Sequence, residues 1–386
     1  MDKWEAILSQ AGLSDIPGPF YIYDLDAVAE RAERVRRAFP DFRLLYSLKA
    51  NPHPAIVALM AARGAGADTA SANETLLAAG RGIPAGMIYY SSPGKTKRDL
   101  LAAAGKCVII ADSMNELNLL NALAAERGER LSVGARLNIP NAAMSGSAHE
   151  VMGGVATKFG IALEEFGSAD LSRLGNIKIA GIHVYFGSQL LDAGIIANNF
   201  SLIASAALEI NKKYPLDFVN FGGGFGVPYL PEEKDLDLKD LSGMVYACPA
   251  ARGLLDSGIV CNIELGRYLA AECGLFVTTA ADVKESFGRK YVIIDGGMNS
   301  FYRPVMTGDF HGVIQPGNGG APETVTLVGN LCTPIDQYYE NITLNAPKAG
   351  DVIAFRNAGA YGYSMSLLEF ISHERPKELI IGGSSN

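Results

Sequence analysis

Short runs of β-branched and aromatic residues alternate with Ala-, Leu- and Glu-rich stretches from about Arg43 onward. The apolar runs predict strands over residues 44–48, 66–69, 87–91, 107–111, 132–137, 177–186, 218–221 and 260–263. Helical patterns between them cover residues 54–63, 73–81, 114–127 and 200–213, among others. Eight strands that alternate with helices predict an α/β fold, a closed parallel (β/α)8 TIM-like barrel. Continuous apolar strands fit this arrangement because helices and the barrel interior cover both of their faces.

The pattern changes after about Leu269, where β-rich runs over 276–283, 290–295, 324–328 and 352–356 follow with few helical stretches. We therefore expect a barrel domain over residues 25–269 and a β-rich C-terminal domain over 270–386. Residues 1–24 are assigned to the second domain because residues 20–23 resemble a further strand. Residues 138–157 are rich in Gly, Ala, Ser and Met, which predicts a mobile loop on the face where barrel active sites lie.

Composition narrows the possible functions. The 386 residues are 48% hydrophobic, enough for a large core and a second domain. A formal net charge of -8 favours neither nucleic-acid binding nor an anionic membrane surface. No run of eighteen apolar residues and no signal peptide is apparent, so we expect no membrane association. The five cysteines are scattered without a CxxC pair, which predicts no metal site and no disulfide framework and fits the cytoplasm.

Lys49 ends the first predicted barrel strand, in the segment Tyr46-Ser-Leu-Lys49-Ala-Asn51. A single lysine is most often a surface or ion-paired residue. Its position at the carboxyl end of a barrel strand changes that interpretation, because barrel chemistry is done on this face. A lysine there could form a Schiff base with an aldehyde cofactor.

Glycines follow the seventh strand, at Gly222, Gly223 and Gly224, where barrels often bind phosphate. Tight turns also use glycine, so this run by itself is weak evidence. The eighth strand leads into Glu264 and Arg267 on either side of Gly266. Arg267 could clamp a phosphate or a carboxylate, whereas an isolated Glu264 would more often be a structural acid.

Ten stretches in chain order, from Tyr46 to Tyr363, carry a resemblance to a known family. They are YSLKAN from Tyr46, DTASANE from Asp68, SPGK from Ser92, KFGI from Lys158, HVYFGSQ from His183, FGGGFGVP from Phe221, ELGR from Glu264, DGGMNSFYRP from Asp295, CTPID from Cys332 and GAYG from Gly359. The chain resembles the fold-type III pyridoxal 5'-phosphate (PLP) decarboxylases, which include the diaminopimelate and ornithine/arginine decarboxylases. This resemblance implies a PLP-dependent carboxy-lyase with an alanine-racemase-like barrel and a C-terminal all-β domain.

The resemblance also implies roles for individual residues. Lys49 would carry PLP, with Asp68 beside it, and Glu264 would face the pyridine nitrogen. Arg136 would lie near the cofactor hydroxyl. Cys332 would return a proton to Cα from the second subunit, which implies a homodimer with shared active sites; outside this motif it would be a small buried hydrophobe. The phosphate and its surroundings would be held by Gly222, Gly223, Gly224, Ser188, Gly266, Arg267 and Tyr361.

Departures from the family pattern are informative. Tyr185 stands where the family has the histidine that stacks on the PLP ring, and His183 lies two residues earlier on the same face of the strand. Either Tyr185 stacks on the ring or His183 takes over. The third possibility is that His183 is a buried core residue whose ring nitrogens are hydrogen-bonded to the backbone.

A second departure concerns the substrate. Thr333 replaces the acid that binds a distal amine in the family, and Thr307 replaces a tyrosine. Arg303 resembles the arginine that grips a distal carboxylate, and the predicted substrate contacts are Arg267, Arg303, Thr333, Asp336 and Tyr361. An L-amino acid with a carboxylate or amide-linked far end fits better than a free diamino acid.

These variants resemble a biosynthetic branch of the family that acts on conjugated amino acids, as in siderophore assembly or on carrier-protein-bound glutamate in antibiotic pathways. An acidic carrier could dock on Lys95, Lys97 and Arg98. Three alternatives stay open: a diaminopimelate decarboxylase of lysine biosynthesis, which Thr333 opposes; an amino-acid racemase, which Glu264 opposes because such racemases place an arginine there; and an inactive PLP-binding homologue.

Overall fold

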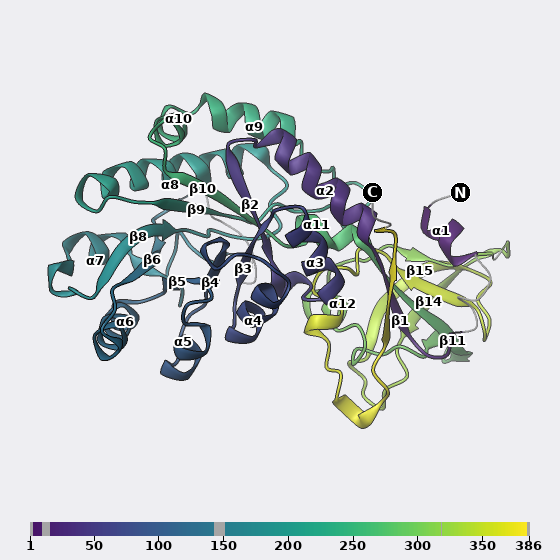
Figure 1. The fold of residues 1–386 in the computed structure, drawn as a ribbon. Coiled ribbons are helices and arrows are strands. Elements are labelled where there is room, and N and C mark those ends of the chain that lie inside the picture. Colours follow the sequence, from purple (N-terminus) through teal and green to yellow (C-terminus); the bar gives the residue numbers. More distant parts are fainter. Residues whose placement is uncertain (1–2, 10–15, 143–150, 318, 384–386) are drawn as a thin grey trace. The chain divides into compact units, whose positions relative to one another are not determined.

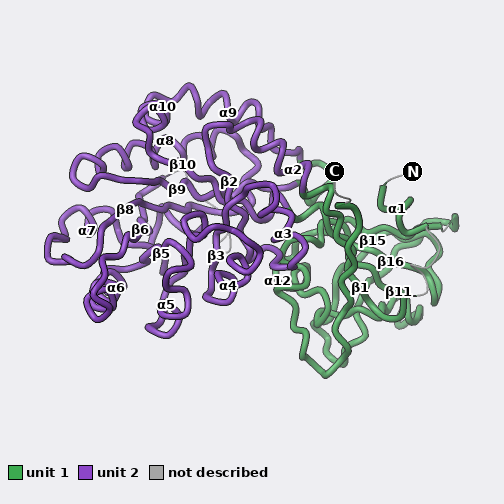
Figure 2. The backbone as a smooth tube through the Cα atoms, in the orientation of Figure 1, with its two compact units in different colours: residues 1–28, 228–233, 270–386 green, residues 29–227, 234–269 purple. Residues whose placement is uncertain are grey.

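The computed structural model describes residues 3–9, 16–142, 151–317 and 319–383. It divides into two compact units, shown in Figure 2. One unit comprises Met1–Val28, Pro228–Glu233 and Ala270–Asn386, and the other comprises Ala29–Val227 and Lys234–Leu269. We call them the β unit and the barrel unit.

Eight parallel strands form the barrel unit. They pair in the order β5-β4-β3-β2-β10-β9-β8-β6, and the pairing of β5 with β6 closes the ring. The closed barrel confirms the fold predicted from the alternating pattern. The strands are β2 (Phe42–Ser47), β3 (Gly66–Thr69), β4 (Ile88–Ser91), β5 (Val108–Ala111), β6 (Leu131–Asn138), β8 (Ile177–His183), β9 (Phe218–Gly223) and β10 (Val260–Leu265), and the short β7 (Ile161–Ala162) pairs with β6.

Helices surround these strands in Figure 1. They are α2 (Leu25–Ala38), α3 (Pro54–Ala62), α4 (Ala72–Gly80), α5 (Lys97–Ala103), α6 (Met114–Arg127), α7 (Leu163–Ser168), α8 (Ala193–Lys213), α9 (Leu238–Ala247), α10 (Pro249–Asp256) and α11 (Arg267–Ala270). Local sequence sets several of their ends. The Ser113 hydroxyl accepts a hydrogen bond from the Glu116 amide at the start of α6, and Gly128 ends the helix with a left-handed backbone.

Helix α8 is, within the described part of the chain, the one helix long and apolar enough to cross a membrane by length and composition. It packs against α9, α10 and β9, and it buries Ile196, Phe200 and Ile203. Its apolar side therefore covers the barrel wall. The helix begins seven residues before the predicted stretch because Asp192 caps it, accepting a hydrogen bond from the Ile195 amide.

The β unit is built from an eight-stranded sheet. Its main path runs β13-β16-β11-β12-β14-β15, and β1 pairs antiparallel with β11 and parallel with β17. Its buried core includes Phe20, Ile22, Leu275 and Val277. The strands are β1 (Phe20–Asp24), β11 (Gly274–Ser286), β12 (Arg289–Ile294), β13 (Val313–Ile314), β14 (Pro322–Val328), β15 (Gln337–Asn345), β16 (Val352–Phe355) and β17 (Lys377–Ile381); the helices are α1 (Lys3–Leu8) and α12 (Arg303–Thr307).

The predicted loop over 138–157 lies partly outside the described residues, which omit 143–150. Its described flanks are tied together by Asn138, whose side chain accepts from the Gly154 amide and donates to the Val155 carbonyl, each at 2.8 Å. Val151 also forms an antiparallel bridge with Gly187. Both ends of the loop are thus anchored at the rim of the barrel near Tyr185.

Candidate active site

Lys49 lies in a single 3-10 turn (Leu48–Ala50) directly after β2. Its Nζ is 3.2 Å from Oδ2 of Asp68 on β3. The two meet because β2 and β3 are parallel and Ser47 is in register with Asp68, so both strands end at the same rim. The Lys49 Nζ also lies 5.3 Å from the centroid of the Tyr185 ring. Its side chain is 34% exposed while that of Asp68 is 2% exposed, so the amine is accessible and its counter-ion is buried.

Glu264 is buried on β10 and is bound by side chains from the two preceding barrel strands. His183 Nε2 of β8 lies 3.0 Å from Glu264 Oε2, and Asn220 Nδ2 of β9 donates to Oε1. His183 Nδ1 lies 3.4 Å from the Ser91 hydroxyl on β4. His183 is therefore engaged by side chains on both ring nitrogens, and its strongest partner is Glu264.

The two buried acids differ in their electrostatics. Burial would raise the pKa of Glu264, but the charge and hydrogen bond of His183, with the charges of Lys49 and Arg136, outweigh it and lower this pKa. Burial and the like charge of Glu264 raise the pKa of Asp68, against the opposing effect of Lys49. Glu264 is thus the acid that the site keeps ionised.

Gly222 and Gly223 end β9 and Gly224 follows it, and a side chain does not fit at these positions. Gly222 and Gly224 have φ values of +62° and +82°. A Cβ on Gly223 would lie 1.8 Å from the Glu264 carbonyl oxygen, and one on Gly224 would lie 2.0 Å from that of Gly187. The main chain therefore approaches its neighbours closely at this rim.

Charged and hydroxyl groups lie on the two strand ends next to these glycines. Arg267 Nη2 donates to the Ser188 hydroxyl at 3.3 Å, and Arg267 is 8% exposed. A guanidinium, a hydroxyl and close-packed glycine backbone are a set suited to a phosphate group. Gly266 is also restricted, though less tightly, because a Cβ there would lie 2.8 Å from the Ala50 Cβ.

Arg136 on β6 is almost fully buried. Its Nη1 lies 3.6 Å from Asp112 Oδ1, and its guanidinium carbon lies 4.5 Å from the centre of the Phe159 ring. Burial lowers the pKa of Arg136, while Asp112 opposes the shift. Asp112 directly follows β5, and this position at a strand end is the signal by which sequence reasoning could have included it.

The remaining predicted residues belong to the β unit. Cys332 is exposed, so it is not the buried hydrophobe of the alternative interpretation. Asp336 is buried and accepts hydrogen bonds from the amides of Met298, at 2.7 Å, and Leu331, at 2.8 Å. Its carboxylate therefore holds the turn that carries Cys332 and Thr333.

Comparison with known proteins identifies the family. Residues 25–271 match the family model described as the pyridoxal binding domain of the pyridoxal-dependent decarboxylases. The chain belongs to this family.

Individual relatives of this decarboxylase support the same family assignment. It is 30% identical over 357 residues to diaminopimelate decarboxylase of Aquifex aeolicus, covering 90% of this chain and 83% of the relative. It is 33% identical over 380 residues to L-glutamyl-[BtrI acyl-carrier protein] decarboxylase of Niallia circulans, covering 94% and 88%. Diaminopimelate decarboxylase of Helicobacter pylori, solved with L-lysine, superimposes with a TM-score of 0.87 at 28% identity over 99% of this chain and 94% of that one.

The rim residues of this decarboxylase fit the cofactor of its family, PLP, which carries an aldehyde, a phosphate and a pyridine nitrogen. Lys49 offers an accessible amine, and Glu264 offers an ionised acid. The glycine run, where a Cβ would overlap backbone atoms, lies beside the pair Arg267 and Ser188. Each reactive feature of the cofactor thus has a chemical counterpart among residues of the barrel unit.

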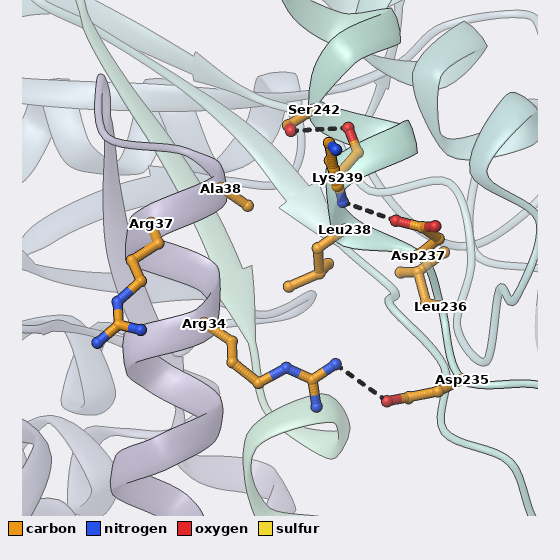
Figure 3. Close-up of a pocket in the computed structure, with 9 residues that line it drawn as sticks. All are labelled: Arg34, Arg37, Ala38, Asp235, Leu236, Asp237, Leu238, Lys239 and Ser242. Carbon is orange, nitrogen blue, oxygen red and sulfur yellow. Dashed lines mark hydrogen bonds and ion pairs between the residues drawn. The ribbon is translucent and has the colours of Figure 1, made fainter.

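A separate hollow of about 610 Å³ in the barrel unit lies between α2 and the start of α9 (Figure 3). Arg34 pairs with Asp235 at 3.2 Å, and Asp237 caps α9 by accepting from the amides of Lys239 and Asp240. These charges serve the fold of the decarboxylase, and the hollow contains none of the predicted site residues.

Proposed function

We propose that this PLP-dependent decarboxylase removes the α-carboxyl group of an L-amino acid whose far end is a carboxylate or a conjugate. Thr333 supports this substrate class because its hydroxyl cannot neutralise a distal ammonium group, and Arg303 supports it as a cation for the far end. Among the relatives, the Niallia circulans name specifies a glutamyl group on a carrier protein. The Staphylococcus aureus relative, 29% identical over 391 residues, is named 2-[(L-alanin-3-ylcarbamoyl)methyl]-2-hydroxybutanedioate decarboxylase.

The observation that carries the mechanism is the ionised, buried Glu264 bound by His183 and Asn220. Bound PLP supplies an electron sink for the bonding pair that remains when CO2 leaves. Glu264 would hold a proton at the pyridine nitrogen, which is the site where this electron density collects. Lys49 would carry the cofactor covalently until the substrate amine replaces it, and Asp68 would orient the released amine.

Other barrel residues would position the cofactor. Tyr185, rather than His183, would cover the ring, because its ring lies near Lys49 Nζ while His183 is engaged with Glu264. Arg136 would lie near the cofactor hydroxyl. The phosphate and its surroundings would be held by Gly222, Gly223, Gly224, Ser188, Gly266, Arg267 and Tyr361.

Cys332 of the partner subunit would return the proton to Cα, so the functional unit would be a homodimer. Arg267, Arg303, Thr333 and Tyr361 would contact the substrate. Asp336 would support this group by holding the Cys332 turn, since its carboxylate is occupied by backbone amides. All five cysteines are free, which fits an enzyme of the reducing cytoplasm.

The second candidate is a diaminopimelate decarboxylase, which the Aquifex aeolicus relative favours. CO2 release by the holoenzyme should be compared with L-glutamate, N5-ethyl-L-glutamine, a glutamyl carrier protein and meso-diaminopimelate. We expect one of the first three to give the highest kcat/KM. A higher value with meso-diaminopimelate would overturn the proposal in favour of the second candidate.

A further inference from the structure

Arg303 begins α12 with a largely buried side chain that already has an acidic partner. Its Nη2 lies 2.5 Å from Asp309 Oδ2, and the two side chains are 9% and 29% exposed. The Tyr361 and Tyr229 ring centres lie 5.5 Å and 6.0 Å from the guanidinium carbon. Its Nε is buried and makes no hydrogen bond to any residue that the structure describes. Asp309 therefore neutralises the guanidinium at Nη2, and Nε still has a hydrogen that it can donate.

Backbone contacts fix Asp309 in this position. Gly308 ends α12 with a φ of +72°, and its amide donates to the Pro304 carbonyl. The Asp309 amide donates to the Thr307 hydroxyl at 3.3 Å, and its carbonyl accepts from the Tyr339 hydroxyl at 3.3 Å. The Thr307 hydroxyl itself donates to the Arg303 carbonyl at 2.9 Å. The turn thus directs the carboxylate back to the first residue of its own helix.

This pairing changes what the guanidinium can accept. A substrate carboxylate on the remaining donors of Arg303 would lie beside the carboxylate of Asp309 in a partly buried site, where like charges repel strongly. A neutral amide meets no such repulsion. Its carbonyl oxygen can accept from Arg303, and its N–H can donate to Asp309.

The geometry points to Asp309 as the residue that selects an amide-linked far end of the substrate over a free carboxylate. This inference rests on the proposed function, because Arg303 is assigned to the substrate site there. It narrows the proposed substrate class from carboxylate- or amide-ended amino acids to the amide-ended ones. Asp309 acts by changing the charge available at Arg303 rather than by taking part in the chemistry.

The experiment compares two matched substrates, L-glutamate and N5-ethyl-L-glutamine, as kcat/KM of the holoenzyme measured by CO2 release. The wild type should prefer the amide by about tenfold or more, and Asp309→Asn should reduce that preference by about tenfold or more. The change should come mainly from better use of glutamate. A general structural defect would lower both values together and leave their ratio unchanged.

The preference for the amide can also be measured without turnover, as the ratio of the calorimetric binding constants of the two product amines, 4-aminobutyrate and its N-ethylamide. If neither substrate is decarboxylated, this binding ratio tests the inference. Asp309→Ala serves as the second variant if Asp309→Asn does not fold. Asp282→Asn, an exposed acid of β11, is the control and should leave the ratio unchanged.

A wild-type preference for the carboxylate, or a ratio that changes less than about twofold in the Asp309 variants, would overturn the inference. Faster decarboxylation of meso-diaminopimelate together with an Asp309-dependent ratio would overturn only the proposed function. The two failures can therefore be told apart.

Discussion

Replacing His183 with alanine tests how Glu264 is kept ionised. Both side chains are about 2% exposed and 3.0 Å apart, so His183→Ala leaves a buried carboxylate with Asn220 as its remaining side-chain partner. Removing one partner of a buried ion pair costs about 3–5 kcal/mol. Glu264 can instead take up a proton, which costs about 3.7 kcal/mol at pH 7 for a carboxyl with an ordinary pKa of about 4.3. Because the process with the lower free-energy cost prevails, we expect His183→Ala to lower the free energy of unfolding by about 3–4 kcal/mol.

The assay is a double-mutant cycle in urea, with His183→Ala and Glu264→Gln made singly and together and unfolding followed by circular dichroism. The cavity left by the imidazole contributes in both backgrounds and cancels in the cycle. The remaining coupling should be at least about 2 kcal/mol, allowing for relaxation and water entry. Ser91→Ala is the control, since it removes one long hydrogen bond of 3.4 Å worth about 1 kcal/mol or less. A coupling below about 0.5 kcal/mol would refute the ion pair as the reason for the lowered pKa of Glu264.

Three further predictions concern Gly224, the pH dependence of stability at Glu264, and the sharing of active sites between subunits. Gly224→Ala should lower the free energy of unfolding by well over about 1 kcal/mol, since it combines a positive φ with a Cβ 2.0 Å from a carbonyl oxygen; Gly258→Ala, with a φ of +79° and nothing within 4 Å of the new Cβ, is the matched control, and equal losses would contradict the steric argument. Because the pKa of Glu264 is lowered in the folded state, its ionised form stabilises the protein above about pH 4.3, and this advantage over Glu264→Gln should disappear as the pH falls through the folded-state pKa. Urea midpoints from pH 7 to pH 3 measure it, and an advantage that grows on acidification would have the wrong sign. Lys49→Ala and Cys332→Ala should each be inactive or slow, yet mixed subunits should regain about a quarter of wild-type CO2 release if the sites are shared in a dimer; no recovery after verified subunit exchange would exclude shared sites.

Local sequence patterns were sufficient for much of the barrel. The bounds of β3 and α6 agree with those predicted, and for α6 the reason is local, because the Ser113 and Gly128 caps mark its two ends in the sequence. Strand β8 ends at His183 rather than at residue 186, since the chain then leaves the ladder toward Ser188. Strand β15 was not predicted because its residues, QYYENITLN, are largely polar and gain their stability from pairing with β14.

Charged residues show where local patterns stop. The basic residues Lys95, Lys97 and Arg98 suggested a docking site for an acidic carrier, but the Lys95 side chain is fully buried and lies 2.6 Å from Glu116. Lys97 pairs with Glu126 at 2.8 Å. Lys95 is therefore not available to a carrier protein, and the carrier hypothesis was wrong for this residue, whereas Lys97 and Arg98 are exposed.

The sequence alone determined the family, the barrel and the set of reactive side chains, because hydrophobic period, glycine positions and motif order are properties of short segments. Only the tertiary structure decided how those side chains are paired. His183 and Glu264 are 81 residues apart in the chain and meet because β8 and β10 lie on either side of β9 in the barrel. Asp309 reaches Arg303 through a turn whose geometry depends on Thr307, Gly308 and the distant Tyr339. Folding sets the distances within these two pairs of charged groups. Those distances decide whether Glu264 is ionised and which substrate group Arg303 can bind.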